Sequence, residues 1–181
     1  FGYEDQYARN NFPLNRGTSK FTDIALYNDT YSTDWSWSVL LEDFNNDGKN
    51  DIFISNGIYK RPNDLDYINY ASDIDFRLFN KNNEKKFYEN LIDKMPTLKI
   101  PNILYLNKGD LEFQKMTHDA GMEKTYSNGA AYGDFDNDGD LDLIVNNINQ
   151  QVSVLENITS NKSTNNFVKV SLVSYGSRFL S

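Results

Sequence analysis

The sequence contains no cysteine and only one histidine among its 181 residues. The absence of cysteine excludes a disulfide framework, a thiolate metal site and a cysteine nucleophile. No apolar run approaches the roughly 18 residues that a membrane-spanning helix requires, and the first residues do not have the pattern of a signal peptide. We therefore expect no transmembrane segment in this chain.

Basic residues are also scarce. Lysine and arginine number 18 against 26 aspartates and glutamates, which gives a formal net charge of -8. Because nucleic-acid binding requires a basic face, this balance predicts no nucleic-acid partner. Much of the acidic excess lies in two short loops at residues 43–51 and 134–142, where bound divalent cations would offset part of the charge.

The chain contains an internal repeat. An Asn-x-Gly turn at residues 15–17 is followed by Phe21, and a second turn at residues 107–109 is followed by Phe113 at the same spacing. Short runs of β-branched and aromatic residues between Asn, Gly and Asp favour strands and hairpins. We expect each unit to hold a strand ending at the turn, a strand beginning near the phenylalanine, a third strand, the acidic loop and a fourth strand. Four antiparallel strands are what a propeller blade requires.

A helical insertion interrupts the repeat. Apolar residues recur at helical spacing over residues 65–78 and again over 84–95. The candidate N-caps are Asn63 or Asp64 for the first helix and Asn82 or Asn83 for the second, which ends at Pro96. The expected fold is therefore mainly β: part of a β-propeller built from four-stranded blades, with a helical hairpin insertion.

The sequence divides into four expected parts. These are a blade region with the first acidic loop (residues 1–58), the helical insertion (59–100), a blade region with the second acidic loop (101–166), and the start of a truncated C-terminal domain (167–181). Residues 152–155 and 167–173 are expected to be strands. Two loop-bearing units cannot close a ring, so we expect the chain to belong to a larger propeller.

Both acidic loops place oxygen-bearing residues at alternate positions, with a glycine (Gly48, Gly139) at position six where the chain turns sharply. Calcium takes about six to eight oxygen ligands, which this alternation supplies. The candidate ligands of the first loop are Asp43, Asn45, Asp47, the backbone carbonyl of Lys49, and Asp51. Those of the second loop are Asp134, Asp136, Asp138, the backbone carbonyl of Asp140, and Asp142. We therefore predict two Ca²⁺ sites, the second tighter because Asn45 replaces a carboxylate.

An EF-hand shares the first six positions of this pattern. It also needs a glutamate at position twelve and a helix on each side. Position twelve is Ile54 in one loop and Val145 in the other, and both lie in runs typical of strands. The EF-hand is therefore excluded. Acidic turns without an ion are the remaining alternative, since Asn, Asp and Gly are common turn residues, but the identical spacing in two loops favours metal binding.

The loop sequences resemble a known family. The Asp-Phe-Asn-Asn-Asp-Gly run from Asp43 and the Gly-Asp-Phe-Asp-Asn-Asp-Gly-Asp-Leu-Asp run from Gly133 are similar to the calcium-loop repeats called FG-GAP or VCBS repeats, found in integrin-like β-propellers. Residues 34–38, 56–57 and 127–132 resemble bacterial repeat proteins with a C-terminal ASPIC/UnbV domain, which would begin at Phe167. The resemblance implies an extracellular or cell-surface protein, outer-membrane associated in a bacterium, in which calcium serves structure.

Other residues offer weaker candidates. His118 is the only histidine, and no Gly-x-Ser-x-Gly nucleophile elbow accompanies it, so we predict no catalytic residues. Trp35 and Trp37 alternate with serines and would face the same side of a strand. We interpret them as core residues between blades, with a platform for sugar rings as the alternative. Tyr59, at the start of the insertion, belongs to a rim element that suits partner binding, with a merely solvated helical hairpin as the alternative.

These observations favour a binding or interaction module at the cell surface, with a protein or a glycan as its partner. The resemblance further implies an accessory subunit of an outer-membrane nutrient-uptake transporter complex. The alternative is a polysaccharide-active enzyme, a lyase or glycoside hydrolase on a propeller scaffold. Paired carboxylates would carry such chemistry, but the clustered carboxylates here are already assigned to metal binding.

Overall fold

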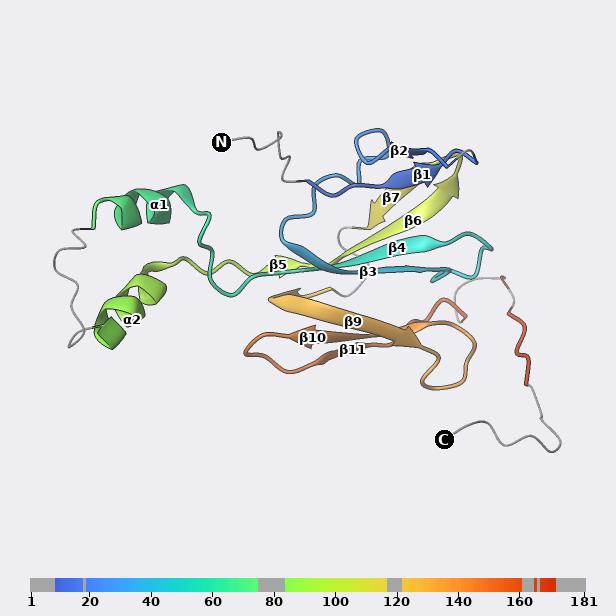
Figure 1. Ribbon diagram of the computed structural model, residues 1–181. Helices are drawn as coiled ribbons and strands as arrows, with labels where there is room; N and C mark the ends of the chain where they lie inside the picture. Colours follow the sequence, from blue (N-terminus) through green and yellow to red (C-terminus); the bar gives the residue numbers. More distant parts are fainter. Residues whose placement is uncertain are drawn as a thin grey trace, which may run out of the picture.

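The computed structural model describes residues 9–17, 19–74, 84–116, 122–160, 165 and 167–171. Over these residues the protein is mainly β, with antiparallel sheets and two helices (Figure 1). The strands are β1 (Pro13–Asn15), β2 (Phe21–Asp23), β3 (Ser36–Glu42), β4 (Asp51–Asn56), β5 (Ile100–Pro101), β6 (Ile103–Gly109), β7 (Glu112–Met116), β8 (Lys124–Thr125), β9 (Ser127–Gly133), β10 (Asp142–Asn147) and β11 (Ser153–Leu155). The helices are α1 (Leu65–Ser72) and α2 (Glu84–Lys94).

The sheets are stacked in layers. A four-stranded sheet in the order β3-β4-β6-β7 lies between the β1-β2 hairpin on one side and the three-stranded sheet β11-β10-β9 on the other (Figure 1). β5, which follows the two helices, forms a short antiparallel pair with β8, the strand that precedes β9. This stacking of antiparallel sheets is the arrangement expected of adjacent blades. The described residues do not form a closed propeller.

The central strand β4 is buried along its whole length. Its successive side chains point to opposite faces of the sheet, so Phe53 packs with Phe44, Leu143 and Val145 toward the β11-β10-β9 sheet. Ile52 and Ile54 instead pack with Ile103 and Tyr105, against which Phe12 and Phe113 also lie. Burial on both faces explains the continuous apolar run in β4 and makes it the centre of the fold.

The sequence repeat and the four-stranded sheet begin at different strands, which corrects the predicted unit. The Asn-x-Gly hairpins occur as expected: Asn15 pairs with Phe21, and Asn107 pairs with Phe113. The second hairpin, β6-β7, joins the sheet of β3 and β4 because β4 pairs with β6 across the insertion. The four-stranded sheet is thus made from the second half of one sequence unit and the first half of the next. The repeat in the sequence gives the spacing between units, but it does not show at which strand a sheet begins.

The two predicted helices are present, although the first ends at Ser72, before the predicted end at residue 78. Asp64 caps α1, its side chain accepting a hydrogen bond from the backbone N of Tyr67 at 3.0 Å. The second helix ends at Lys94, two residues before Pro96, while its candidate caps Asn82 and Asn83 lie outside the described residues. Figure 1 shows α1 and α2 projecting away from the sheets, and neither helix contains a buried residue.

No helix among the described residues is both long enough and apolar enough to span a bilayer.

Two predictions about exposed segments are wrong. Trp37 is 52% exposed, and its indole N donates to the carbonyl of Gly57 at 2.6 Å instead of packing in the core. Residues 167–171 form no strand, and the rest of the predicted strand lies outside the described residues. This segment runs along the acidic loops, where the Lys169 side chain donates to Asn137 Oδ1 at 2.7 Å. Polar side-chain contacts take the place of strand pairing there.

Candidate metal centres

The two acidic loops have the same backbone turn. The first connects β3 to β4 and the second connects β9 to β10. Asn46 and Gly48 have φ values of 57° and 84°, and Asn137 and Gly139 have φ values of 66° and 93°. Asparagine and glycine tolerate this left-handed region better than other residues. The residue types at positions four and six therefore explain why both loops fold alike.

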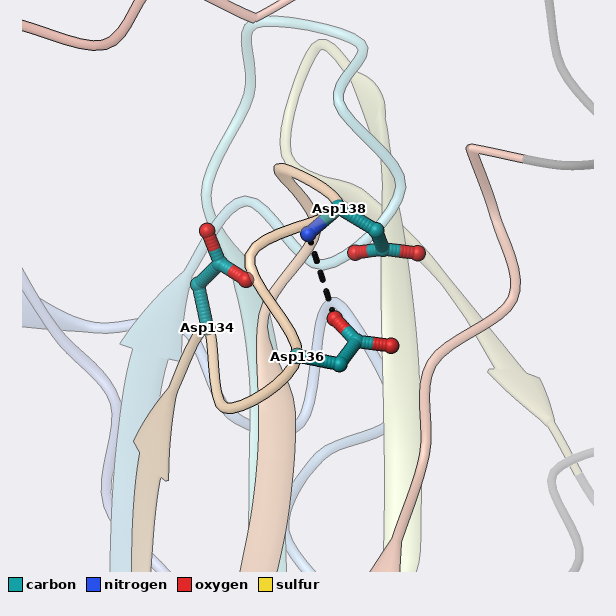
Figure 2. A group of neighbouring side chains, drawn as sticks. All are labelled: Asp134, Asp136 and Asp138. Carbon is teal, nitrogen blue, oxygen red and sulfur yellow. Dashed lines mark hydrogen bonds between the residues drawn. The ribbon is translucent and has the colours of Figure 1, made fainter.

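The second loop brings three carboxylates together. One oxygen from each of Asp134, Asp136 and Asp138 lies within 4.8 Å of the others. Figure 2 shows these side chains around a single turn, with the backbone N of Asp138 donating to Asp136 Oδ1 at 3.2 Å. Asp134 Oδ1 is buried and has no hydrogen-bond partner. Carboxylates crowded in this way, with a buried oxygen left unpaired, fit a hard divalent cation such as Ca²⁺.

Asp140 contributes more to this site than its predicted backbone carbonyl. Its side chain is fully buried, Oδ2 accepts a hydrogen bond from the backbone N of Ser160 at 2.6 Å, and Oδ1 has no partner. Burial raises the pKa of Asp140, while hydrogen bonding with the Asp140 side chain lowers the pKa of Asp138. A bound cation would favour the charged form of both carboxylates. The signal in the sequence was an aspartate at position seven where the first loop has Lys49.

The first loop gathers its carboxylates less closely. Asp43 accepts hydrogen bonds from the backbone N of Asp47 at 3.0 Å and of Gly48 at 2.7 Å. Asn45 Nδ2 donates to Asp47 Oδ2 at 3.2 Å, and Lys49 Nζ lies 3.7 Å from the same oxygen. Over the described parts of the chain, the trio in the second loop is the only close group of three acidic side chains. The predicted order of the two sites stays a prediction.

Position nine has the same role in both loops. Asp51 Oδ2 accepts from the backbone N of Phe44 at 3.1 Å, and Asp142 Oδ2 accepts from that of Phe135 at 2.9 Å. The Oδ1 atoms of Asp51 and Asp142 accept from the backbone N of Asn107 and of Asn157, each at 2.8 Å. Burial raises the pKa of Asp51. These aspartates tie each loop to the following segment, and lone pairs remain on their oxygens for a metal, so their ligand role stays a prediction.

Asn157 reveals a third copy of the turn that the sequence did not show. Its side-chain oxygen accepts from the backbone N of Thr159 at 3.1 Å, as that of Asn107 accepts from Gly109 at 2.9 Å. The side-chain nitrogen of Asn157 donates to the backbone carbonyl of Leu141, at position eight of the second acidic loop. In the same way, the side-chain nitrogen of Asn107 donates to the backbone carbonyl of Asn50, at position eight of the first acidic loop. Threonine in place of glycine conceals the repeat. The end of β11 is thus equivalent to the end of β6.

Comparison with known proteins identifies one repeat. Residues 100–145, which run from β5 through the second acidic loop into β10, match the FG-GAP-like repeat family. Repeats of this kind often bind calcium and are typical of extracellular or cell-surface proteins. No match was found among curated proteins or among solved structures. The chain therefore contains an FG-GAP-like repeat, and the aspartate cluster at 134–138 lies inside it.

Proposed function

We propose that this chain is part of a calcium-stabilised β-propeller that serves as a binding module at the cell surface, with a protein or a glycan as its partner. The observation that carries the calcium assignment is the convergence of Asp134, Asp136 and Asp138 around a buried, unpaired oxygen. When bound, the ion supplies positive charge that offsets the repulsion among these carboxylates. The expected result is a fixed turn between β9 and β10.

The position of the second loop makes its order important for the whole fold. Leu143 and Val145 follow the loop in β10 and pack against Phe53 of the central sheet and Phe44 of the first acidic loop. Tyr132, just before the loop, donates its hydroxyl hydrogen bond to the Glu42 carboxylate, next to the first loop. An ion that fixes the second loop therefore also fixes the contact between two layers. The first loop is the second candidate site, weaker because Asn45 supplies no charge.

The binding surface is proposed on the helical insertion. Its base is fixed by an ion pair between Arg61 and Asp34 at 2.6 Å and by a hydrogen bond from the backbone N of Arg61 to the carbonyl of Pro96 at 3.0 Å. Lys94 Nζ lies 6.0 Å from the centre of the Tyr70 ring, which links the two helices. Apolar side chains are exposed on this firm base: Leu65 75%, Ile68 44%, Tyr70 40% and Ile92 48%. Exposed apolar residues on an addition to a rigid scaffold suit a partner.

The finer assignments rest on the sequence resemblance alone. These assignments are that the chain belongs to a bacterial protein with an ASPIC/UnbV domain that begins at Phe167, that the protein is associated with the outer membrane, and that it acts as an accessory subunit of a nutrient-uptake complex. The alternative of a polysaccharide lyase or glycoside hydrolase stays a prediction too. Its one candidate histidine, His118, lies outside the described residues, and the carboxylates of the second loop are accounted for as metal ligands.

Thermal unfolding tests the calcium assignment. An ion that binds only the folded state stabilises it by about 2.7 kcal/mol at a concentration one hundred times its dissociation constant. We therefore expect the melting temperature to fall when calcium is replaced by a chelator. The effect should shrink strongly in Asp136→Ala and remain in Asp66→Ala, a matched change on α1. A melting temperature that is the same with calcium and with chelator would contradict the assignment.

A triple variant tests the binding surface. Leu65→Ser, Ile68→Ser and Ile92→Ser together remove exposed apolar groups without touching a buried residue. We expect this variant to keep the calcium-dependent melting of the native chain and to lose its partner in cross-linking to intact cells and on glycan arrays. Retention of all binding by the triple variant would place the partner surface elsewhere.

A further inference from the structure

The second acidic loop receives two hydrogen bonds from a residue outside it. Ser160 follows β11 and is half-buried. Its hydroxyl donates to Asp138 Oδ2 at 2.8 Å, and its backbone N donates to Asp140 Oδ2 at 2.6 Å. One residue from a later segment thus holds one oxygen of each of two neighbouring carboxylates. This double contact orients both side chains at once.

The oxygens that Ser160 does not hold are left for other partners. Asp138 Oδ1 accepts from the backbone N of Asp140 at 3.1 Å, so its direction is set within the loop. Asp140 Oδ1 belongs to a fully buried side chain and has no partner. Asp134 Oδ1, in the adjoining cluster, is also buried and unpaired. A buried oxygen without a partner costs free energy unless a ligand compensates it, and two such oxygens beside clustered carboxylates call for a cation.

Ser160 is placed there by the repeated turn at Asn157. The backbone N of Asn157 donates to Asp142 Oδ1 at 2.8 Å, and its side-chain oxygen accepts from both the backbone N and the hydroxyl of Thr159. The residue that follows, Ser160, is thereby directed at positions five and seven of the loop. At the equivalent place after Asn107 the chain has an exposed aspartate, Asp110, and position seven of the first loop is the exposed Lys49. The arrangement is therefore particular to the second site.

We propose that Ser160 is a positioning residue of the second metal site, supplied by the segment that follows β11. It holds Asp138 and Asp140 so that their remaining oxygens face the cation. This inference rests on the proposed binding of calcium at the second loop. Removal of a side chain that orients metal ligands from outside the coordination shell typically lowers metal affinity by about 10- to 100-fold. We expect about a 10-fold loss for Ser160→Ala, because the backbone hydrogen bond to Asp140 remains.

An NMR titration of the full chain distinguishes the two loops. Gly48 and Gly139 occupy position six of the first and second loop, so their amide signals report each site separately. Free calcium is set with a chelator buffer, and the midpoint for each glycine is measured in the native chain and in Ser160→Ala, Ser160→Thr and Ser32→Ala. Ser32 is exposed and supplies the matched loss of a hydroxyl. The melting temperature of each calcium-free variant is measured alongside.

In Ser160→Ala we expect the Gly139 midpoint to move to about 10-fold higher free calcium. In Ser160→Thr, which keeps the hydroxyl, the midpoint should return toward the native value. In Ser32→Ala it should not move. An unchanged Gly139 midpoint in Ser160→Ala overturns the inference and leaves calcium binding standing. If Ser160→Ala lowers the calcium-free melting temperature but leaves the Gly139 midpoint unchanged, the contact is purely structural and the inference is again overturned. No calcium response of Gly139 in the native chain overturns the proposed calcium site itself.

Discussion

The side-chain nitrogen of Asn157 donates to the carbonyl of Phe44 at 2.7 Å. Phe44 is at position two of the first acidic loop, and the same nitrogen also donates to Leu141, at position eight of the second, at 3.2 Å. One amide group therefore joins two loops that lie far apart in the sequence. The Thr159 hydroxyl, which donates to Asn157 Oδ1 at 2.7 Å, lies 3.4 Å from the same Phe44 carbonyl. The two candidate metal sites thus share a polar junction between adjacent sheets.

Replacing Asn157 by alanine should weaken this junction. The change removes the donor for Phe44 and Leu141 and the acceptor for Thr159. Because carbonyls in a half-buried setting lose their partner, we expect the free energy of unfolding to fall by about 1–3 kcal/mol. Urea denaturation measures this loss. Asn146→Ala, which removes an exposed hydrogen bond to Asn128, is the control and should change stability by about 0.5 kcal/mol or less.

The two loops should differ in their sensitivity to substitution. Asp138→Ala removes a carboxylate of the cluster and the acceptor for Ser160, whereas Asn45→Ala removes a neutral amide. We therefore expect the stabilisation by calcium to be nearly abolished in Asp138→Ala and to be mostly kept in Asn45→Ala. The difference in melting temperature with and without calcium measures both. A larger loss in Asn45→Ala would reverse the order of the sites.

Gly57 should tolerate no side chain. Its φ is +148°, and a Cβ there would lie 2.6 Å from Tyr126 Cα and 2.7 Å from the backbone N of Ser127. Since backbone cannot move aside cheaply, we expect Gly57→Ala to lower the free energy of unfolding by roughly 2–5 kcal/mol. Gly17 also has a positive φ, +75°, but has open space around it. Gly17→Ala should therefore cost only about 1–2 kcal/mol, and equal losses would argue against close approach at Gly57.

Asp23 should make the β1-β2 hairpin sensitive to acid. Hydrogen bonds from the backbone N of Ala25 and of Phe12 to its Oδ1, each 3.0 Å, lower the pKa of Asp23 below its ordinary value, and the Arg9 ion pair at 2.8 Å acts in the same direction. A carboxyl whose pKa is lower in the folded state stabilises the fold above the unfolded pKa, and this contribution is lost as pH falls through the folded pKa.

Stability measured by urea denaturation between about pH 5 and pH 3 should therefore decrease in the native chain. Asp23→Asn keeps the size of the side chain but does not titrate, so its stability should depend less on pH over this range. Asp93→Asn, on the exposed part of α2, serves as the control. An identical pH profile for Asp23→Asn and the native chain would show that Asp23 does not contribute to acid sensitivity.

Much of the local structure was predictable from the sequence. The spacing of asparagine and glycine predicted both hairpins, apolar periodicity and Asp64 predicted α1, and Gly48 and Gly139 predicted the turns of the acidic loops. In each case the determining residues lie within a few positions of one another. Turn chemistry, helix capping and backbone freedom act over that range and can be read without knowing the rest of the fold.

The wrong predictions concern features that depend on distant residues. Trp37 alternates with serines as a core residue would, but its face of β3 is left half exposed and its indole bonds to Gly57. The third Asn turn at Asn157 was missed because threonine stands where the other copies have glycine. Only its hydrogen bonds to Asp142 and Leu141 identify it.

The sequence by itself determined where oxygen ligands alternate, and hence that Asp134, Asp136 and Asp138 can surround a cation. Only the tertiary structure decided that β4 pairs with β6 across the insertion, and so which strands form the four-stranded sheet. It also decided that the Asp140 side chain is buried and that Ser160 reaches it. The physical reason is range: ligand spacing is set by neighbouring residues, whereas strand register, burial and contacts between segments arise only when the chain packs against itself.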